Sequence, residues 1–326
     1  MQEELENAVQ NALTNIFEGS HFSKTEVIQN LWSGYGEIAR YSQERGDNSV
    51  IVKMVDPNAG GHHPRGWNTN TSHQRKLSSY VNEQNFYRYY AGSTNRRCRV
   101  PDCLAYNTET GANWLVMEDL DRAGFEERRE YASSKIVERG LEWLAHFHAI
   151  FAQSDGEHLW PIGTYWHLKT RPDEWRRMES GALKTHAKNI DQILNSANYQ
   201  TLVHGDAKLA NFCFDRSFEY LAAVDFQYVG RGVGIKDVVY FLGSCLSEQA
   251  LFEQADKLLD YYFSELGEAL GQYQTSVNAI ELEQEWRYLL PFAWADFERF
   301  LVGWAPEHFK RHRYSIMQTE KALDLI

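Results

Sequence analysis

The sequence predicts an α+β protein in two unequal parts, a smaller part built on an antiparallel sheet followed by a larger, mainly helical part. Two observations support this. Strand-like runs are concentrated before residue 118, and helical periodicity dominates after residue 124. The length of 326 residues corresponds to about two domains of ordinary size, so it admits either one large two-lobed domain or two separate ones. We place the boundary so that residues 1–118 form the first part and residues 119–326 the second.

Residues 31–41 predict two short strands around a glycine turn that contains Gly34 and Gly36. Residues 49–55 form a β-branched run of strand length. Residues 56–72 are rich in Gly, Pro, Asn and Ser, which is typical of a long loop. Residues 77–91 then show apolar side chains at helical spacing.

The strand at residues 49–55 carries a charge that needs an explanation. Alternation puts Val50, Val52 and Met54 on one face and Ile51, Lys53 and Val55 on the other. A lysine on so apolar a strand needs a counter-charge or a function, because burying an unpaired ammonium group is costly.

Later segments alternate long helices with short strands. Residues 113–120 predict a buried strand, and residues 135–151 predict a helix with one apolar face. Further helices are expected over residues 249–270 and 281–300, and short strands over residues 200–203, 211–214 and 220–225.

Composition excludes several classes of protein. The formal net charge is −12, from 33 basic and 45 acidic residues, which disfavours binding to nucleic acids or to anionic membranes. The sequence has no apolar run of membrane-spanning length and no secretory signal at its start. Its four cysteines do not form a disulfide or zinc pattern, so we expect free thiols and a cytoplasmic location. The oligomeric state is left open.

The strongest chemical signal is the segment HGDAKLAN at residues 204–211, followed by VDFQ at residues 224–227. Phosphoryl transfer needs a carboxylate that accepts the proton of the attacking hydroxyl, a cation that offsets phosphate charge, and oxygen ligands for Mg²⁺. Asp206 fits the base and Lys208 fits the phosphate contact. Asn211 and Asp225 fit the metal ligands.

These two motifs resemble those of the aminoglycoside phosphotransferase and choline kinase superfamily. The longer stretch DFQYVGRGVGIKDVVYFL is most similar to its ecdysteroid kinase-like branch. The resemblance implies a protein-kinase-like two-lobed fold, in which residues 1–118 bind the nucleotide and residues 119–326 carry the catalytic loop and the acceptor site. It also implies ATP and Mg²⁺ as cofactors and a small-molecule hydroxyl as acceptor.

The resemblance assigns further residues to the nucleotide. Gly34 and Gly36 would lie over the phosphates, although an ordinary hairpin turn explains them equally well. Lys53 would hold the phosphates and pair with Glu83, for which the alternative is a solvated helix face. Met117 and Glu118 lie in the connector whose backbone would bind adenine.

The second motif is followed by a segment that supports the loop rather than reacting. Asp237 is expected to cap a helix or to brace the catalytic loop. His204 is expected to hold that loop through backbone hydrogen bonds rather than to act as a base.

The acceptor side is less determined. The resemblance places it in the helical part, where the candidate segments are residues 160–166 and 290–304. Trp294, Phe297, Leu301 and Trp304 form an aromatic stripe at helical spacing that is either core or pocket wall. If this stripe is open, Asp296 and Glu298 would attract a cationic acceptor such as an amino alcohol or aminoglycoside. Sugar and sterol-like acceptors are equally compatible with the sequence.

Alternative functions are a catalytically silent nucleotide-binding protein of the same fold, a protein kinase and a purely structural helical protein. HGD and DFQ replace the HRD and DFG of protein kinases, and no APE follows, which disfavours the protein kinase. The structural reading leaves Lys53, Asp206, Asn211 and Asp225 unexplained.

Overall fold

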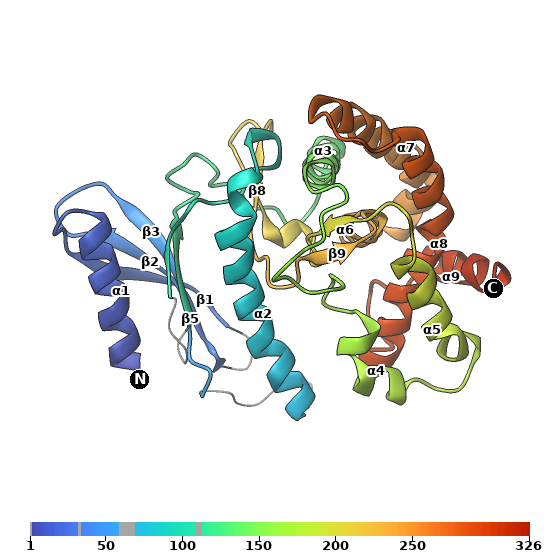
Figure 1. Cartoon of the computed structure of the whole chain (residues 1–326), viewed down its shortest axis with the longest axis horizontal. Helices are drawn as coiled ribbons and strands as arrows, with labels where there is room; N and C mark the ends of the chain where they lie inside the picture. Colours follow the sequence, from blue (N-terminus) through green and yellow to red (C-terminus); the bar gives the residue numbers. More distant parts are fainter. Residues whose placement is uncertain (1, 32–33, 59–68, 108–112) are drawn as a thin grey trace.

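A computed structural model describes residues 2–31, 34–58, 69–107 and 113–326. A sheet with one flanking helix lies at one end of the molecule, and a larger helical body lies at the other (Figure 1). The α-helices are α1 (Gln2–Ile16), α2 (Asn70–Tyr89), α3 (Ser134–Ile150), α4 (Pro172–Arg177), α5 (Ala182–Asn195), α6 (Ile235–Cys245), α7 (Glu248–Gln272), α8 (Ala279–Trp304) and α9 (Arg313–Asp324). Short 3₁₀ turns are η2 (Ala91–Ser93), η3 (Arg96–Cys98), η4 (Leu168–Thr170) and η5 (Leu209–Asn211).

The N-terminal sheet is antiparallel, with the strand order β1-β2-β3-β5-β4. Its strands are β1 (Phe22–Asn30), β2 (Gly36–Gln43), β3 (Ser49–Val55), β4 (Cys103–Tyr106) and β5 (Asn113–Glu118). The predicted α+β class and the strands at residues 49–55 and 113–120 are therefore confirmed. The first predicted strand is displaced, because β1 ends at Asn30 rather than lying within residues 31–41. All of β1 after Phe22 is exposed, so it lacks the apolar alternation that identifies a strand.

The predicted alternation along β3 positions the charged residue. Val50, Val52 and Met54 pack with Leu5, Val9 and Leu13 of α1 in one apolar cluster. The period of two then turns Lys53 toward the opposite face. Since α1 covers the first face of the sheet (Figure 1), the lysine is free to face α2 and the helical body.

Helix α2 begins earlier than the sequence predicts. The hydroxyl of Thr69 caps it by accepting from the backbone N–H of Ser72 at 3.1 Å. The helix therefore starts inside the predicted loop at residues 56–72, of which residues 59–68 lie outside the described part of the chain. It stands between the sheet and the helical body (Figure 1).

The helical body shares its core with the inner face of the N-terminal part. One cluster joins Phe86 of α2 and Met117 of β5 to side chains of α3, α6, α7 and α8. Phe86 stacks on Phe226, with ring centroids 3.9 Å apart and planes at 11°. The predicted helices at residues 135–151, 249–270 and 281–300 are confirmed as α3, α7 and α8.

Two small ladders hold the motif segments. Strands β6 (Thr201–Val203) and β9 (Gly230–Gly232) pair antiparallel, as do β7 (Phe212–Phe214) and β8 (Leu221–Ala223). The HGDAKLAN loop leaves β6 and enters β7, and VDFQ follows β8. In the described part of the chain, no helix has the length and apolar character that a membrane crossing needs.

Candidate active site

A cleft of about 1130 Å³ lies between the sheet and the helical body. It brings together most of the residues that the sequence predicts for a site, although they come from β3, α2, β5 and the two motif loops. Those that line it are Lys53, Glu83, Met117, Glu118, Asp206, Lys208, Asn211 and Asp225. Gly34 and Gly36 are not among the lining residues, and Tyr35 between them is.

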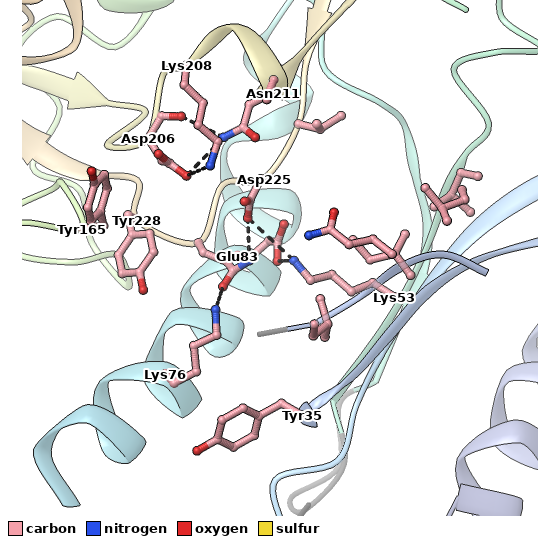
Figure 2. A pocket seen from close by; sticks show the side chains of 18 of the residues that line it. Tyr35, Lys53, Lys76, Glu83, Tyr165, Asp206, Lys208, Asn211, Asp225 and Tyr228 are labelled. Atoms are coloured by element: carbon pink, nitrogen blue, oxygen red, sulfur yellow. Dashed lines mark hydrogen bonds and ion pairs between the residues drawn. The ribbon is translucent and has the colours of Figure 1, made fainter. Parts of the chain in front are cut away.

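A buried ion pair crosses from the sheet to α2. The Nζ of Lys53 lies 2.5 Å from Oε2 of Glu83 and 3.8 Å from Oδ1 of Asp225. Both partners of the closer pair are buried, with exposed fractions of 3% and 2%. Burial lowers the pKa of Lys53, but Glu83 and Asp225 raise it by more, so the pKa lies above its ordinary value and the lysine is charged. Glu83 is therefore a buried counter-charge and not a solvated residue (Figure 2).

Asp206 lies at the other end of the cleft and is held by several donors. Its Oδ2 accepts from the Nζ of Lys208 at 3.0 Å and from Nδ2 of Asn211 at 3.3 Å. Its Oδ1 accepts from the hydroxyl of Tyr240 at 2.9 Å. Burial raises the pKa of Tyr240 well above its ordinary value, so this phenol stays protonated and donates. The carboxylate is thus fixed in one orientation before any substrate binds.

The loop that carries Asp206 is braced from beneath by Asp237 on α6, as predicted. The carboxylate of Asp237 accepts from the backbone N–H of His204 at 2.6 Å and of Gly205 at 2.9 Å. It also lies 3.2 Å from Nε2 of His148 on α3. His204 in turn contacts the carbonyl of Val224 at 3.1 Å. The loop is therefore tied to both α3 and the second motif.

Asp225 lies between the Lys53–Glu83 pair and Asp206 (Figure 2). Its φ of 69° is rare for a residue other than glycine, and such strain is found most often where function requires it. Nε2 of Gln227 donates to its Oδ1 at 2.5 Å, and the Nζ of Lys76 donates to Oε1 of Gln227 at 3.0 Å. Burial raises the pKa of Asp225, but Lys53, Lys208 and Lys76 together lower it by more, so it is ionised.

Asn211 and Asp225 fit a hard divalent cation. Nδ2 of Asn211 is used by Asp206, which leaves its Oδ1 without a hydrogen bond inside the described chain. Oδ2 of Asp225 is likewise not used by the described residues. Magnesium in proteins takes carboxylate and carbonyl oxygens together with substrate phosphates, so these two atoms are suitable ligands.

The two glycines shape the turn between β1 and β2. Gly36 has a φ of 145°, and a Cβ there would lie 2.0 Å from the carbonyl oxygen of Met54 on β3. Gly34 has a φ of 74° with open space around it. Glycine is thus required at residue 36 by close strand packing, and at residue 34 by backbone conformation alone. The phosphate contact expected of both stays a prediction.

The connector after β5 presents backbone to the cleft. The N–H of Glu118 donates to the carbonyl of Asp102 at 2.8 Å, so it is already used. The carboxylate of Glu118 is held by Arg99 at 2.5 Å. The N–H of Leu120, which also lines the cleft, makes no hydrogen bond to the described residues. An adenine in this cleft would therefore find its donor at Leu120 rather than at Glu118.

The expected acidic attraction for a cationic acceptor is wrong. Asp296 is 1% exposed and forms ion pairs with Lys236 at 3.2 Å and Arg299 at 2.8 Å. Glu298 is also buried, and its Oε1 accepts from Arg311 at 2.7 Å. Neither carboxylate lines the cleft. Arg299, on the next turn of the same helix, and the distant Lys236 neutralise Asp296, and Arg311 neutralises Glu298.

The aromatic stripe is mostly core. Trp294, Phe297 and Leu301 are buried, whereas Trp304 is partly exposed and lines the cleft. Tyr165, within the candidate segment 160–166, lines the cleft. The acceptor side also contains residues that sequence reasoning missed: Arg75, Arg171, Tyr228, Tyr240 and Lys310. Only Tyr240 carried a signal, since it lies three residues after Asp237 and so shares its helix face.

The sequence matches the profile of the ecdysteroid kinase-like family over residues 40–157 and 166–275. The chain belongs to the ecdysteroid kinase-like family. It is therefore a member of a kinase-like phosphotransferase family of small-molecule kinases, as the two motifs predict. No curated protein matches the sequence of this ecdysteroid kinase-like chain.

Three solved structures to which the chain is similar are distant in sequence. A protein assigned as a fructosamine-3-kinase from Haemophilus somnus 129PT is 12% identical, with 97% of this chain and 96% of that chain covered and a TM-score of 0.47. An aminoglycoside-3'-phosphotransferase of type VIII is 16% identical, with coverage of 89% and 98% and a TM-score of 0.43. An aminoglycoside phosphotransferase from Streptomyces rimosus ATCC10970, in complex with ADP and streptomycin, is 12% identical, with coverage of 88% and 98% and a TM-score of 0.41.

Proposed function

We propose that this ecdysteroid kinase-like chain is an ATP- and Mg²⁺-dependent kinase that phosphorylates a hydroxyl group of a small molecule. One observation carries the proposal. A buried Lys53–Glu83 pair and an oriented Asp206 face the same cleft, with the ionised Asp225 between them. A purely structural role does not explain why these charges converge on open space. The free cysteines agree with the expected cytoplasmic location.

The nucleotide would lie along the sheet side of the cleft. Adenine would enter between Met117 and Leu120 and accept a hydrogen bond from the N–H of Leu120. The charged Lys53 would contact the phosphates, and Glu83 would keep its ammonium group aligned. Asn211 and Asp225 would hold Mg²⁺, which supplies positive charge to the phosphates when it is bound.

Asp206 would orient the hydroxyl of the acceptor and take its proton. The hydroxyl oxygen forms a bond to the γ-phosphorus, the bond from that phosphorus to the β-phosphate oxygen breaks, and ADP leaves with the bonding electrons. Lys208 lies next to Asp206, so it can move from the carboxylate to the transferred phosphoryl group as negative charge develops there. Tyr240 keeps the carboxylate in place throughout.

A silent nucleotide-binding protein remains the second candidate. Both oxygens of Asp206 already accept hydrogen bonds, from Lys208 and from Tyr240. A protein that binds a nucleotide without reacting could retain this closed network. The two candidates differ in turnover and agree in nucleotide binding.

The test is ADP release from Mg-ATP in pools of amino alcohols, aminoglycosides, sugars, nucleosides and sterols. We expect release in one pool, a loss of at least about a thousandfold in Asp206→Asn, and an unchanged dissociation constant for Mg-ATP in that variant. Asp256→Asn, on the exposed face of α7, is the matched control. Retained turnover in Asp206→Asn would refute the assignment of the base. Binding of Mg-ATP without release in any pool would favour the silent protein.

A further inference from the structure

The acceptor side of the cleft contains a guanidinium group without an acidic partner. Nη1 of Arg75 donates to the carbonyl of Thr170 at 2.9 Å, and its Nη2 donates to Oγ of Ser72 at 3.0 Å. Both acceptors are neutral. Tyr228 is a further hydrogen-bond partner of Arg75, and no carboxylate among the described residues lies within ion-pair distance of this guanidinium group. Burial lowers the pKa of Arg75, and the nearby charge of Arg171 lowers it further.

Arg171 lies beside Arg75, and only part of its hydrogen-bonding capacity is used. Its Nε donates to the carbonyl of Tyr165 at 2.5 Å, and its Nη1 donates to Oε1 of Glu174 at 3.0 Å. These bonds do not use Nη2. The guanidinium carbon lies 5.1 Å from the ring centroid of Phe300. Arg171 is therefore a rigid cation, 8% exposed, against an aromatic wall of the cleft.

The pKa of Tyr228 indicates a positive electrostatic potential in this part of the cleft. It lies beside Tyr165, with ring centroids 5.9 Å apart, on the side of Asp225 away from Lys53 (Figure 2). Burial raises the pKa of Tyr228, but Lys76, Arg171 and Arg75 lower it by more, so the net pKa lies below the ordinary value of 10. A phenol deprotonates more readily only where the surroundings favour negative charge.

A further cation lies on the same side. The ammonium group of Lys310 is 4.1 Å from the ring centroid of Tyr240, and it has no ion-pair partner among the described residues. Against these cations, the acidic groups nearby are Asp206, which pairs with Lys208, Glu174, which pairs with Arg171, and Asp225, which pairs with Lys53. The local balance is thus positive in a chain whose net charge is −12. The half-buried Arg75 and the buried Lys310 have no carboxylate partner among the described residues, which is costly in the free protein, and a bound anion would offset that cost.

We propose that the hydroxyl compound phosphorylated in this cleft carries an anionic group (carboxylate, sulfate or phosphate) that binds Arg75 and Arg171 beside Tyr228. The inference rests on the proposed kinase function and narrows its acceptor class. The phosphates of the nucleotide would instead contact Lys53, on the other side of Asp225 (Figure 2). The aromatic rings of Tyr165 and Phe300 would contact the apolar part of the same acceptor.

The test compares matched probes on one aromatic scaffold: para-hydroxymethyl benzoate, its neutral amide, and the cationic para-aminomethyl benzyl alcohol. Dissociation constants are measured by tryptophan fluorescence with Mg-ADP bound. We expect the benzoate to bind at least about tenfold more tightly than the amide, and the amine to bind most weakly. This preference should fall to about onefold in Arg75→Met and Arg171→Met, while the dissociation constant for Mg-ATP changes by less than about twofold.

Two further variants make the result interpretable. Arg171→Lys keeps the charge and should retain part of the preference, and Arg176→Met, on the exposed side of α4, should retain all of it. Equal or tighter binding of the amide or amine overturns the proposal, as does a benzoate that does not saturate the site at millimolar concentration. So does an equal loss of Mg-ATP affinity in the arginine variants, which would assign the cations to the nucleotide. Absent ADP release with a retained preference for the benzoate would instead defeat the proposed kinase function alone.

Discussion

The charged Lys310 should lower the free energy of unfolding at neutral pH, and the substitution Lys310→Met should raise it again. The side chain lies between α8 and α9, is 9% exposed, and stands over the ring of Tyr240 without an ion pair to the described residues. Burial lowers its pKa from 10.5 to about 8, although the charge of Asp206 opposes this change. Methionine has nearly the same length and shape and carries no charge.

The magnitude follows from the two pKa values. Each unit of difference between the folded and unfolded states is worth about 1.4 kcal/mol, so a fall from 10.5 to about 8 corresponds to roughly 3 kcal/mol. Because the folded-state pKa is the lower one, the cost is fully present below pH 8 and disappears as the pH rises toward 10.5. The variant should therefore be more stable by about 3 kcal/mol at pH 7 and by about 2 kcal/mol at pH 9.

Urea unfolding of the two proteins at pH 7 and at pH 9 measures this difference directly. Lys257→Met, on the exposed face of α7, is the control and should change the free energy of unfolding by less than about 0.5 kcal/mol. If Lys310→Met is less stable than the wild type at pH 7, or if its advantage does not shrink at pH 9, the lysine is not held charged at a cost. We also expect Lys310→Met to bind the acceptor more weakly, because the ammonium group of Lys310 lines the cleft.

Further predictions concern the supports of the site. Gly36→Ala should lower the free energy of unfolding by more than about 2 kcal/mol, because the new methyl group meets a backbone carbonyl, whereas Gly34→Ala should cost only about 1 kcal/mol. Asp237→Asn should lower the free energy of unfolding by about 3 kcal/mol and lower turnover. An amide cannot accept from the N–H groups of both His204 and Gly205 and also from His148. An unchanged melting temperature would contradict this. The pKa of Asp296 is lowered to about 2, because the charges of Lys236 and Arg299 outweigh the effect of burial. About 2 kcal/mol of the free energy of unfolding should therefore be lost as the pH falls from 3.8 through 2. Acid unfolding of Asp296→Asn should lack that step. Lys53→Met should weaken Mg-ATP binding by at least about tenfold in calorimetry and lower stability by about 3 kcal/mol, because it strands a buried carboxylate.

Local rules predicted the residues of the cleft to which we assign nucleotide binding and the catalytic base. Alternation along residues 49–55 turned Lys53 to the correct face of β3, and the two motifs placed Asp206, Asn211 and Asp225 in loops that the structure brings to one cleft. The orientation of Lys53 needed only periodicity, whereas its role and that of Glu83 came from the resemblance to the family. Helix α1 was missed, although Leu5, Val9 and Leu13 follow one another at steps of four and pack on the sheet.

The prediction that Asp296 and Glu298 attract a cationic acceptor was wrong because both residues form ion pairs. Asp296 and Glu298 are acidic residues next to an aromatic stripe, yet each is neutralised by basic residues. Conversely, Arg75, Arg171 and Lys310 come from α2, from the turn before α4 and from the loop before α9. Nothing in their local sequence indicates that they face the same space. Charge balance in a site of this kind is a property of tertiary contacts alone.

The stack of Phe86 on Phe226 attaches α2 to the helical body. Helix α2 precedes residue 118, but it is fastened along its length to the helical body: Asn82 donates to the carbonyl of Val229 at 2.9 Å, and Asn85 donates to that of His158 at 2.8 Å. The Lys53–Glu83 pair is therefore more than a contact within the first 118 residues, because it ties strand β3 to a helix that is itself attached to the helical body.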